Sequence, residues 1–242
     1  MFNFLKGIFS SNKGSRVEIN PAREMLKKAT VLKKEKKYDE ACNKLKQAFL
    51  SEGASDLLAK ERMRLPMYLQ LAKKNDEGWK ILNEINVEYT DVFSQAEIAN
   101  QMRVFLQKEK NYIQAILFSI WNICKEVERD RFNIQSSINL TDQCVLNKAE
   151  FGFEEDEDEK ETVYGKTPKG NPITDSAYKM FIDRVNKNIS KSGVSDSIST
   201  LLKKANKEEL IDSLSKSISN YLHSSKQYEL REVREIIKSI LL

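Results

Sequence analysis

The chain has few of the residues that mark turns. Its 242 residues include 8 glycines and 4 prolines. A fold made of many short strands would need more of them, whereas long helices joined by short loops need few. Apolar residues make up 40% and charged residues 31% of the chain, which is typical of helices with much exposed surface. The composition therefore predicts an all-α protein.

Residues that bind metals or act as catalytic nucleophiles are also scarce. His223 is the only histidine, and the three cysteines, Cys42, Cys124 and Cys144, form no C-x-x-C pair. This excludes the usual zinc-ligand spacings and most pairs of a Ser or Cys nucleophile with a His base. The chain also lacks a glycine-rich phosphate-binding loop. We therefore expect no enzyme activity, no metal and no cofactor, and we expect all three cysteines to be buried thiols.

Long apolar runs are absent as well. No stretch approaches the ~18 apolar residues of a membrane-spanning helix. The apolar residues 1–9 are too few for a signal peptide, and a flexible linker is predicted over residues 10–15. As a helix, residues 1–9 would place their apolar side chains on one side, to dock on the fold or to contact a membrane surface weakly. We expect a cytoplasmic protein of bacterial origin.

The charges are unevenly distributed, although the formal net charge is only +4. Nine Lys and Arg residues stand against four acids between Arg23 and Lys46, whereas residues 154–161 carry seven acids and one lysine. The basic segment could meet nucleic-acid phosphates, but it has few interleaved aromatic residues for base stacking. The acidic run lacks the alternating ligands of a calcium loop, so a solvated loop is the simpler interpretation. The other hypothesis is that it folds back, until a partner displaces it, onto three lysines of the basic segment: Lys33, Lys34 and Lys37.

Three segments of the chain repeat at intervals of 37 residues. KKYDEACNKL, KKNDEGWKIL and KNYIQAILFS begin at residues 36, 73 and 110. A repeat of this kind predicts helix–turn–helix units, in which the first helix ends at the lysine and a small residue lets the second helix pack closely. The columns in register are the lysines Lys36, Lys73 and Lys110, the leucines Leu32, Leu69 and Leu106, and the small residues Ala41, Gly78 and Ala115. The second helices add Leu45 and Leu82, and Ser119 departs from this column.

Boundary signals agree with these units. Asn20 followed by Pro21 predicts an N-cap and a first helical residue. Residues 94–97, SQAE, have the pattern of a capping box that opens the third unit. Pro66 conflicts with a regular helix, because proline removes a backbone hydrogen bond, so we expect that helix to be kinked or to start one turn late.

The pattern resembles the tetratricopeptide repeat (TPR) family over about residues 21–128. The residues that carry the resemblance are Ala29, Leu32, Tyr38, Ala41, Leu45 and Ala48, then Leu69, Gly78 and Leu82, and then Leu106, Tyr112 and Ala115. The period exceeds the family's 34 residues, which implies longer loops between units. The resemblance implies a solenoid of helical hairpins whose first helices line a concave groove for a partner's peptide or helix.

Transfer of the family's groove positions to this register gives a set of candidate partner-binding residues. The set mixes flexible methionines with basic and amide groups, which favours a partner segment that is partly apolar and partly acidic. It does not reproduce the Lys, Asn and Arg set with which some family members hold a C-terminal carboxylate. The candidates are Arg23, Thr30, Lys33 and Lys34 in the first hairpin, Lys60, Met63, Met67 and Gln70 in the second hairpin, and Asn100, Gln107 and Lys108 in the third hairpin.

The register fades beyond Lys125. We expect an N-terminal segment and linker over residues 1–19, three hairpins over 20–130, and a helix over 131–153 that would open a fourth hairpin. An acidic loop that also contains proline and glycine is predicted over 154–174. Residues 175–242 are predicted to be helical, with an amphipathic helix over 176–189 and a final hairpin that caps the stack.

These patterns favour a non-enzymatic adaptor or scaffold that binds another protein in a TPR-like groove. One alternative is a basic accessory protein that contacts nucleic acid or a membrane surface. Another is a helical enzyme whose site has no recognisable motif. The partner, the pathway and the oligomeric state are not encoded in any pattern found in the sequence.

Overall fold

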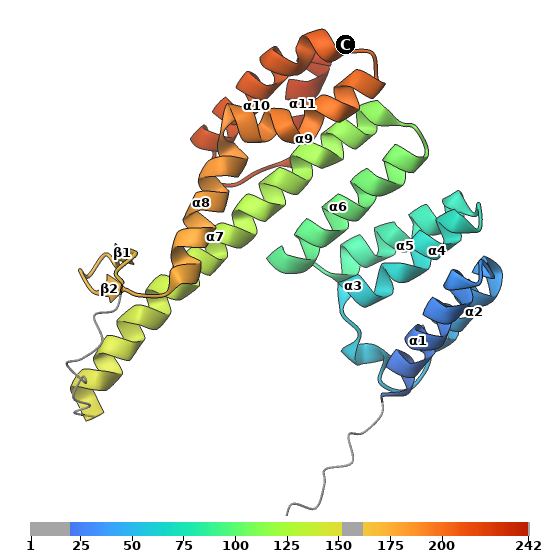
Figure 1. Ribbon diagram of the computed structural model, residues 1–242, viewed down its shortest axis with the longest axis horizontal. Coiled ribbons are helices and arrows are strands. Elements are labelled where there is room, and N and C mark those ends of the chain that lie inside the picture. Colours follow the sequence, from blue (N-terminus) through green and yellow to red (C-terminus); the bar gives the residue numbers. More distant parts are fainter. Residues whose placement is uncertain (1–19, 152–161, 242) are drawn as a thin grey trace, which may run out of the picture. The chain divides into compact units, whose positions relative to one another are not determined.

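The computed structural model describes residues 20–151 and 162–241 (Figure 1). The chain divides into two compact units after Gly78, inside a helix. Both units consist mainly of α-helices, so the all-α prediction is confirmed. The architecture is of the helical-repeat kind and is compatible with a TPR-like fold.

The first unit contains a helical hairpin followed by short helices. α1 (Pro21–Lys34) and α2 (Tyr38–Phe49) form the hairpin, and η1 (Ala54–Asp56), α3 (Ala59–Arg62) and α4 (Arg64–Leu71) follow it. α5 (Asn75–Glu88) begins in this unit and continues into the second. The core of the unit is formed by fully buried side chains that include Leu26, Ala29, Leu45, Leu65 and Leu69.

The second unit is built around one long helix. α6 (Val92–Lys108) packs beside α7 (Tyr112–Phe151), which continues well beyond the N-terminal end of α6 (Figure 1). Two short antiparallel strands, β1 (Gly165–Lys166) and β2 (Pro172–Ile173), and α8 (Ser176–Ile189) lie along this extension. The remaining elements are α9 (Lys191–Lys204), η2 (Glu208–Leu210), α10 (Ile211–Ser224) and α11 (Leu230–Leu241).

The three lysines of the predicted column share the same backbone conformation. Lys36, Lys73 and Lys110 have φ values of 62°, 60° and 62°. Two backbone hydrogen bonds close the first turn, from Lys36 N to Lys33 O (3.1 Å) and from Lys37 N to Leu32 O (3.0 Å), and the other two turns have the equivalent bonds. This is the Schellman arrangement at a helix C-terminus, in which a residue with positive φ ends the helix. The register read from the sequence is therefore confirmed at all three turns.

A fourth turn of the same kind joins α9 to η2 and α10. Asn206 has a φ of 56°, and the N–H group of Lys207 donates to Leu202 O at 2.9 Å. Leu202 is thus equivalent to Leu32, Leu69 and Leu106 in the other three turns. The sequence search missed this turn because the end of α7, the strands and α8 interrupt the spacing of 37 residues.

The predicted small residues are excluded from solvent. Ala41, Gly78 and Ala115 are all buried. Ser119, which departs from the leucine column, is also buried, and its hydroxyl donates to the backbone oxygen of Ser197 at 3.0 Å. The buried hydroxyl of this serine therefore has a hydrogen-bond partner, as buried polar groups usually do.

The predicted helix boundaries have mixed outcomes. Asn20 caps α1 and Pro21 is its first residue, as expected. The helical segment before Pro66 is interrupted at Met63, between α3 and α4, in agreement with the expected irregularity. The capping box at residues 94–97 is wrong, because α6 begins at Val92 and the Asp91 carboxylate accepts from the N–H groups of the next turn. A carboxylate at the helix N-terminus satisfies these donors and also interacts favourably with the helix dipole.

The segment beyond residue 130 also differs from expectation. Residues 131–151 are helical, but they continue α7 and do not open a new hairpin. The predicted loop over 154–174 contains the antiparallel pair β1 and β2, in which Gly165 lies opposite Ile173. The amphipathic helix predicted over 176–189 is confirmed as α8. The acidic run at 154–161 and the segment 1–19 lie outside the described residues.

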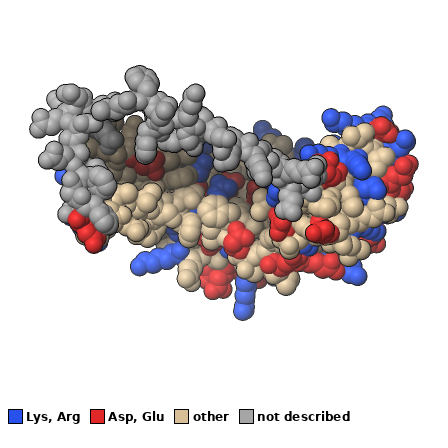
Figure 2. Space-filling model, turned by 90° about the horizontal axis from the view of Figure 1, so that it is seen from below, with Lys and Arg blue, Asp and Glu red and all other residues tan. Residues whose placement is uncertain are grey.

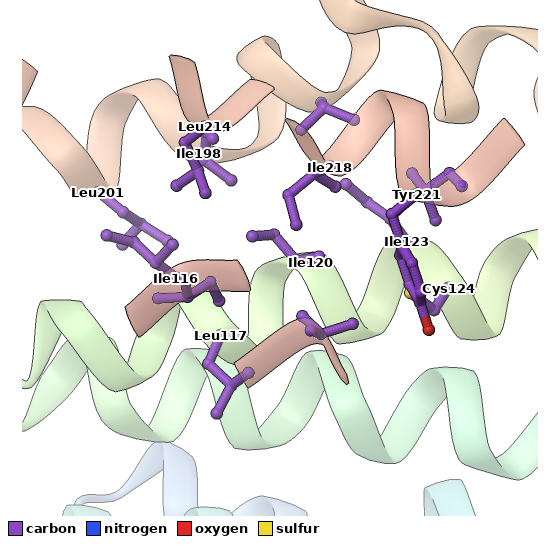
Figure 3. Packing of buried hydrophobic residues seen from close by; sticks show 14 of the residues in the cluster. Ile116, Leu117, Ile120, Ile123, Cys124, Ile198, Leu201, Leu214, Ile218 and Tyr221 are labelled. Atoms are coloured by element: carbon purple, nitrogen blue, oxygen red, sulfur yellow. The ribbon is translucent and has the colours of Figure 1, made fainter. Parts of the chain in front are cut away.

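The main core of the second unit lies between α7, α9, α10 and α11. Figure 3 shows Ile116, Ile120 and Ile123 of α7 facing Ile198 of α9 and Ile218 of α10.

Two of the cysteines are buried as predicted, and burial raises the thiol pKa of Cys42 to about 11 and of Cys124 to about 12. The prediction is wrong for Cys144, which is exposed on the extension of α7. In the described parts of the chain, no helix is long and apolar enough to cross a membrane.

Candidate functional site

Three of the predicted groove residues in the first unit hold the unit together. Arg23 forms an ion pair with Glu61 (3.2 Å) and donates to the backbone oxygen of Asp56. Thr30 donates to Leu26 O at 2.9 Å and also receives a hydrogen bond from Arg64. Met63 is buried. These side chains serve the packing of α1 against the segment that follows α2.

The other predicted residues of the first unit remain accessible. Lys33, Lys34 and Lys60 are exposed, and Met67 and Gln70 are half-buried. Arg64, which the sequence analysis did not single out, donates to Leu26 O at 3.0 Å. Its guanidinium thereby occupies part of the α1 surface that the resemblance assigns to a partner.

Several lysines of the basic segment already have acidic partners. Lys27 pairs with Glu24 (2.6 Å), Lys37 with Glu35 (2.9 Å), and Lys46 with Glu77 (2.5 Å). Figure 2 shows that basic and acidic side chains are interspersed on the face in view. Because these pairs are exposed, each contributes little to stability, but each reduces the positive potential of the segment.

Two of the three predicted groove residues of the second unit contact one arginine. Arg103 of α6 donates through Nη2 to Asn100 Oδ1 (2.7 Å) and through Nη1 to Gln107 Oε1 (3.1 Å). Asn100 and Lys108 are exposed, whereas Arg103 and Gln107 are half-buried. The structure thus brings two of the predicted residues together around a cation that the sequence analysis missed. The helical spacing of Asn100, Arg103 and Gln107 was the signal that could have identified it.

Glu126 of α7 interacts electrostatically with the Arg103 guanidinium. Burial lowers the pKa of the Arg103 guanidinium from its ordinary value, and the Glu126 carboxylate opposes this shift. Glu126 also accepts hydrogen bonds from Asn122 (3.2 Å) and from Asn188 of α8 (3.4 Å). We call Asn100, Arg103, Gln107, Asn122, Glu126 and Asn188 the Arg103 cluster. Hydrogen bonds connect its α6 residues to one another and its α7 residues to Asn188 of α8, and the two groups interact through the charges of Arg103 and Glu126. No sequence spacing could have linked residues so far apart.

The Arg103 cluster has the chemistry of a peptide-binding surface. Asparagine and glutamine amides both donate and accept, so they can pair with the backbone of an extended segment. The guanidinium remains protonated at any ordinary pH and binds carboxylates in a bidentate manner. Asn100 and Gln107 hold the arginine in place, so less side-chain entropy is lost when a partner binds.

A second polar arrangement joins α7 and α8. Asp130 is completely buried, and Arg184 donates to both of its oxygens, at 2.9 and 2.5 Å. An open surface pocket of about 460 Å³ lies beside Arg184 and is lined by Tyr164, Ser176, Lys179, Met180, Asp183 and Lys187. The two lysines that line this pocket, Lys179 and Lys187, are exposed side chains of α8, and Arg184 is already paired with Asp130. The pocket therefore offers a ligand no polar group that the fold holds in place. The ion pair primarily anchors α8.

Among residues 20–151 and 162–241, no group of three His, Cys, Asp or Glu side chains lies close enough to hold a metal ion. The structure therefore suggests no metal-ligating residues in these segments. Comparison of the chain with protein-family models, with curated proteins and with solved structures finds no match.

Proposed function

We propose that the chain is a TPR-like helical-repeat protein that binds another protein without catalysing a reaction. The observation that carries this proposal is the Arg103 cluster, in which a half-buried arginine is held by Asn100 and Gln107. Asn100 and Gln107 of this cluster stand at positions that the family resemblance assigns to partner binding. It favours an extended or helical partner segment that presents at least one carboxylate beside apolar side chains.

The charge distribution supports a protein partner over nucleic acid. Nearby acids weaken the attraction of a cation for phosphate, and several lysines of the basic segment are paired with acids. Three cysteines without a disulfide are compatible with a reducing cytoplasm.

The proposal predicts that loss of the Arg103 charge weakens partner capture. The full-length protein would be immobilised and incubated with native lysate, and bound proteins would be quantified by mass spectrometry. Arg103→Gln would be compared with Arg231→Gln, which removes an exposed charge from α11. A charge-assisted hydrogen bond contributes about 1.5–3 kcal/mol, so we expect a ten- to hundredfold loss of affinity only for the first variant.

Two results would contradict the proposal. One is that both variants capture the same proteins in the same amounts as the unmodified chain. The other is that nuclease treatment removes everything that is captured and that binding falls steeply with salt concentration, as expected for phosphate contacts. Circular dichroism and a thermal melt of Arg103→Gln would verify that the variant is folded.

A further inference from the structure

The extension of α7 presents a largely exposed helix face, at whose start the Phe132 ring packs edge-on against Phe93 of α6, with ring centroids 5.6 Å apart. Phe132, Leu140 and Leu146 are 51%, 62% and 61% exposed. The polar contacts of this face stay within α7, since Gln135 donates to Asn139 (2.9 Å) and the Ser136 hydroxyl donates to a backbone oxygen of the same helix. The opposite side of the extension holds the strands and the start of α8.

Residues 133–147 of α7 include almost no charged side chains. Asp142 is the only charged residue between Asn133 and Asn147, although 31% of the whole chain is charged. The Asp142 carboxylate accepts a hydrogen bond from Asn171 (2.8 Å) and lies 3.5 Å from Lys169 Nζ, so it faces the strands. An exposed surface helix is normally covered with charges, and their depletion here is typical of the centre of an interface.

The spacing of the exposed residues fits contact with a second helix. Phe132, Asn139 and Leu146 recur every seven residues, and Ser136 and Gln143 lie between them at intervals of four and three. This is the spacing at which side chains remain on the contact side of two paired helices. The pattern places an amide-rich centre between two apolar ends.

We propose that this face binds the same face of a second copy of the chain, with the two α7 helices antiparallel. A charged partner would have to bury its charges against a surface that cannot pair with them, which is costly. The second copy is uncharged on this face, and its amides can donate to and accept from those of the first. In the antiparallel arrangement the two-fold axis passes near Asn139 and Gln143, and the Phe132 end of each copy meets the Leu146 end of the other.

The contact is short, so the association should be weak. Residues 132–147 span roughly 24 Å of helix, and an interface of this length lies at the small end of specific protein contacts. Sedimentation velocity of the full-length protein should therefore show a monomer at low concentration and an increasing share of dimer toward the high micromolar range. The inference is independent of the proposed function, because it concerns a different part of α7 and a different measurement.

Charge substitution at the two-fold axis gives the decisive test. Asn139→Lys places two like charges close together in the dimer, and Asn139→Asp does the same with the opposite sign, so each variant alone should remain monomeric. An equimolar mixture of the two should recover the dimer, because opposite charges then face each other. Asn220→Lys, at an exposed asparagine of α10, should associate like the unmodified chain.

The rescue in the mixture cannot arise from misfolding, since two unfolded variants would not restore each other. A chain that stays monomeric at every concentration would overturn the proposal. So would association that persists in Asn139→Lys, which would place the interface elsewhere or assign this face to a segment of the same chain. Failure of the mixture to dimerise, when each variant alone has lost association, would rule out the antiparallel two-fold contact.

Discussion

The turn between α6 and α7 gives a prediction that depends only on backbone conformation. Lys110 has a φ of 62°, in a region where a side chain with a Cβ atom is strained and glycine is not. Its side chain is exposed. We predict that Lys110→Gly stabilises the second unit against unfolding, although it removes a long side chain and adds a flexible residue.

The expected gain is the difference between two opposing effects. Relief of the left-handed strain is worth about 1–2 kcal/mol. The greater conformational freedom of glycine in the unfolded chain costs about 0.5–1 kcal/mol. The net increase in the free energy of unfolding should therefore be about 0.5–1 kcal/mol, as is usual when a glycine occupies a position of positive φ. Lys110→Ala keeps the Cβ atom and hence the strain, so it should change stability by less than about 0.5 kcal/mol.

Tryptophan fluorescence during urea denaturation provides the assay. Trp79 and Trp121 are the only tryptophans, and both belong to the second unit, so the signal reports the unfolding of that unit. With slopes of about 1–3 kcal/mol per molar urea, the midpoint should rise by a few tenths of a molar. Equal midpoints for Lys110→Gly and Lys110→Ala would show that this turn does not adopt the left-handed conformation and would refute the Schellman register.

Three further predictions concern the second unit. Arg184→Gln should destabilise it by about 2–4 kcal/mol in the same assay, because the completely buried Asp130 carboxylate loses its main partner. Hydrogen bonds from Thr167 and Asn171 lower the pKa of the Asp142 carboxyl, so its stabilisation of the strands is complete above the ordinary Asp pKa and is lost as the pH falls through the lower folded-state value. The protection factors of the strand amides, which correct for the intrinsic pH dependence of hydrogen exchange, should therefore fall in acid, and Asp142→Asn should remove this dependence. Iodoacetamide should modify Cys144 rapidly in the native protein, whereas rapid modification of the two buried cysteines should require denaturant.

The sequence predicts the local geometry of the repeat because that geometry depends on neighbouring residues. The lysine, leucine and small-residue columns each mark a position in a turn or at a close helix contact, and a spacing of 37 residues makes them visible. The fourth turn, at Asn206, has the same geometry but no detectable spacing, because an insertion precedes it. The length of α7 escaped prediction for a related reason. A helix can run through the expected boundary near residue 130 when no proline or glycine interrupts it.

The candidate site was only partly predictable, because its members are joined by tertiary packing. Family positions on α6 identified Asn100 and Gln107, and their spacing on one helix would also have indicated Arg103. Glu126 and Asn188 enter only because α7 and α8 pack beside each other, and no local pattern encodes that contact. The same packing explains why Arg23, Thr30 and Met63 are poor candidates. Residues suited by type to hold a partner are equally suited to hold the next helix of their own chain, and in the first unit the chain itself uses them. A groove position therefore predicts partner binding only where the fold leaves its side chain accessible.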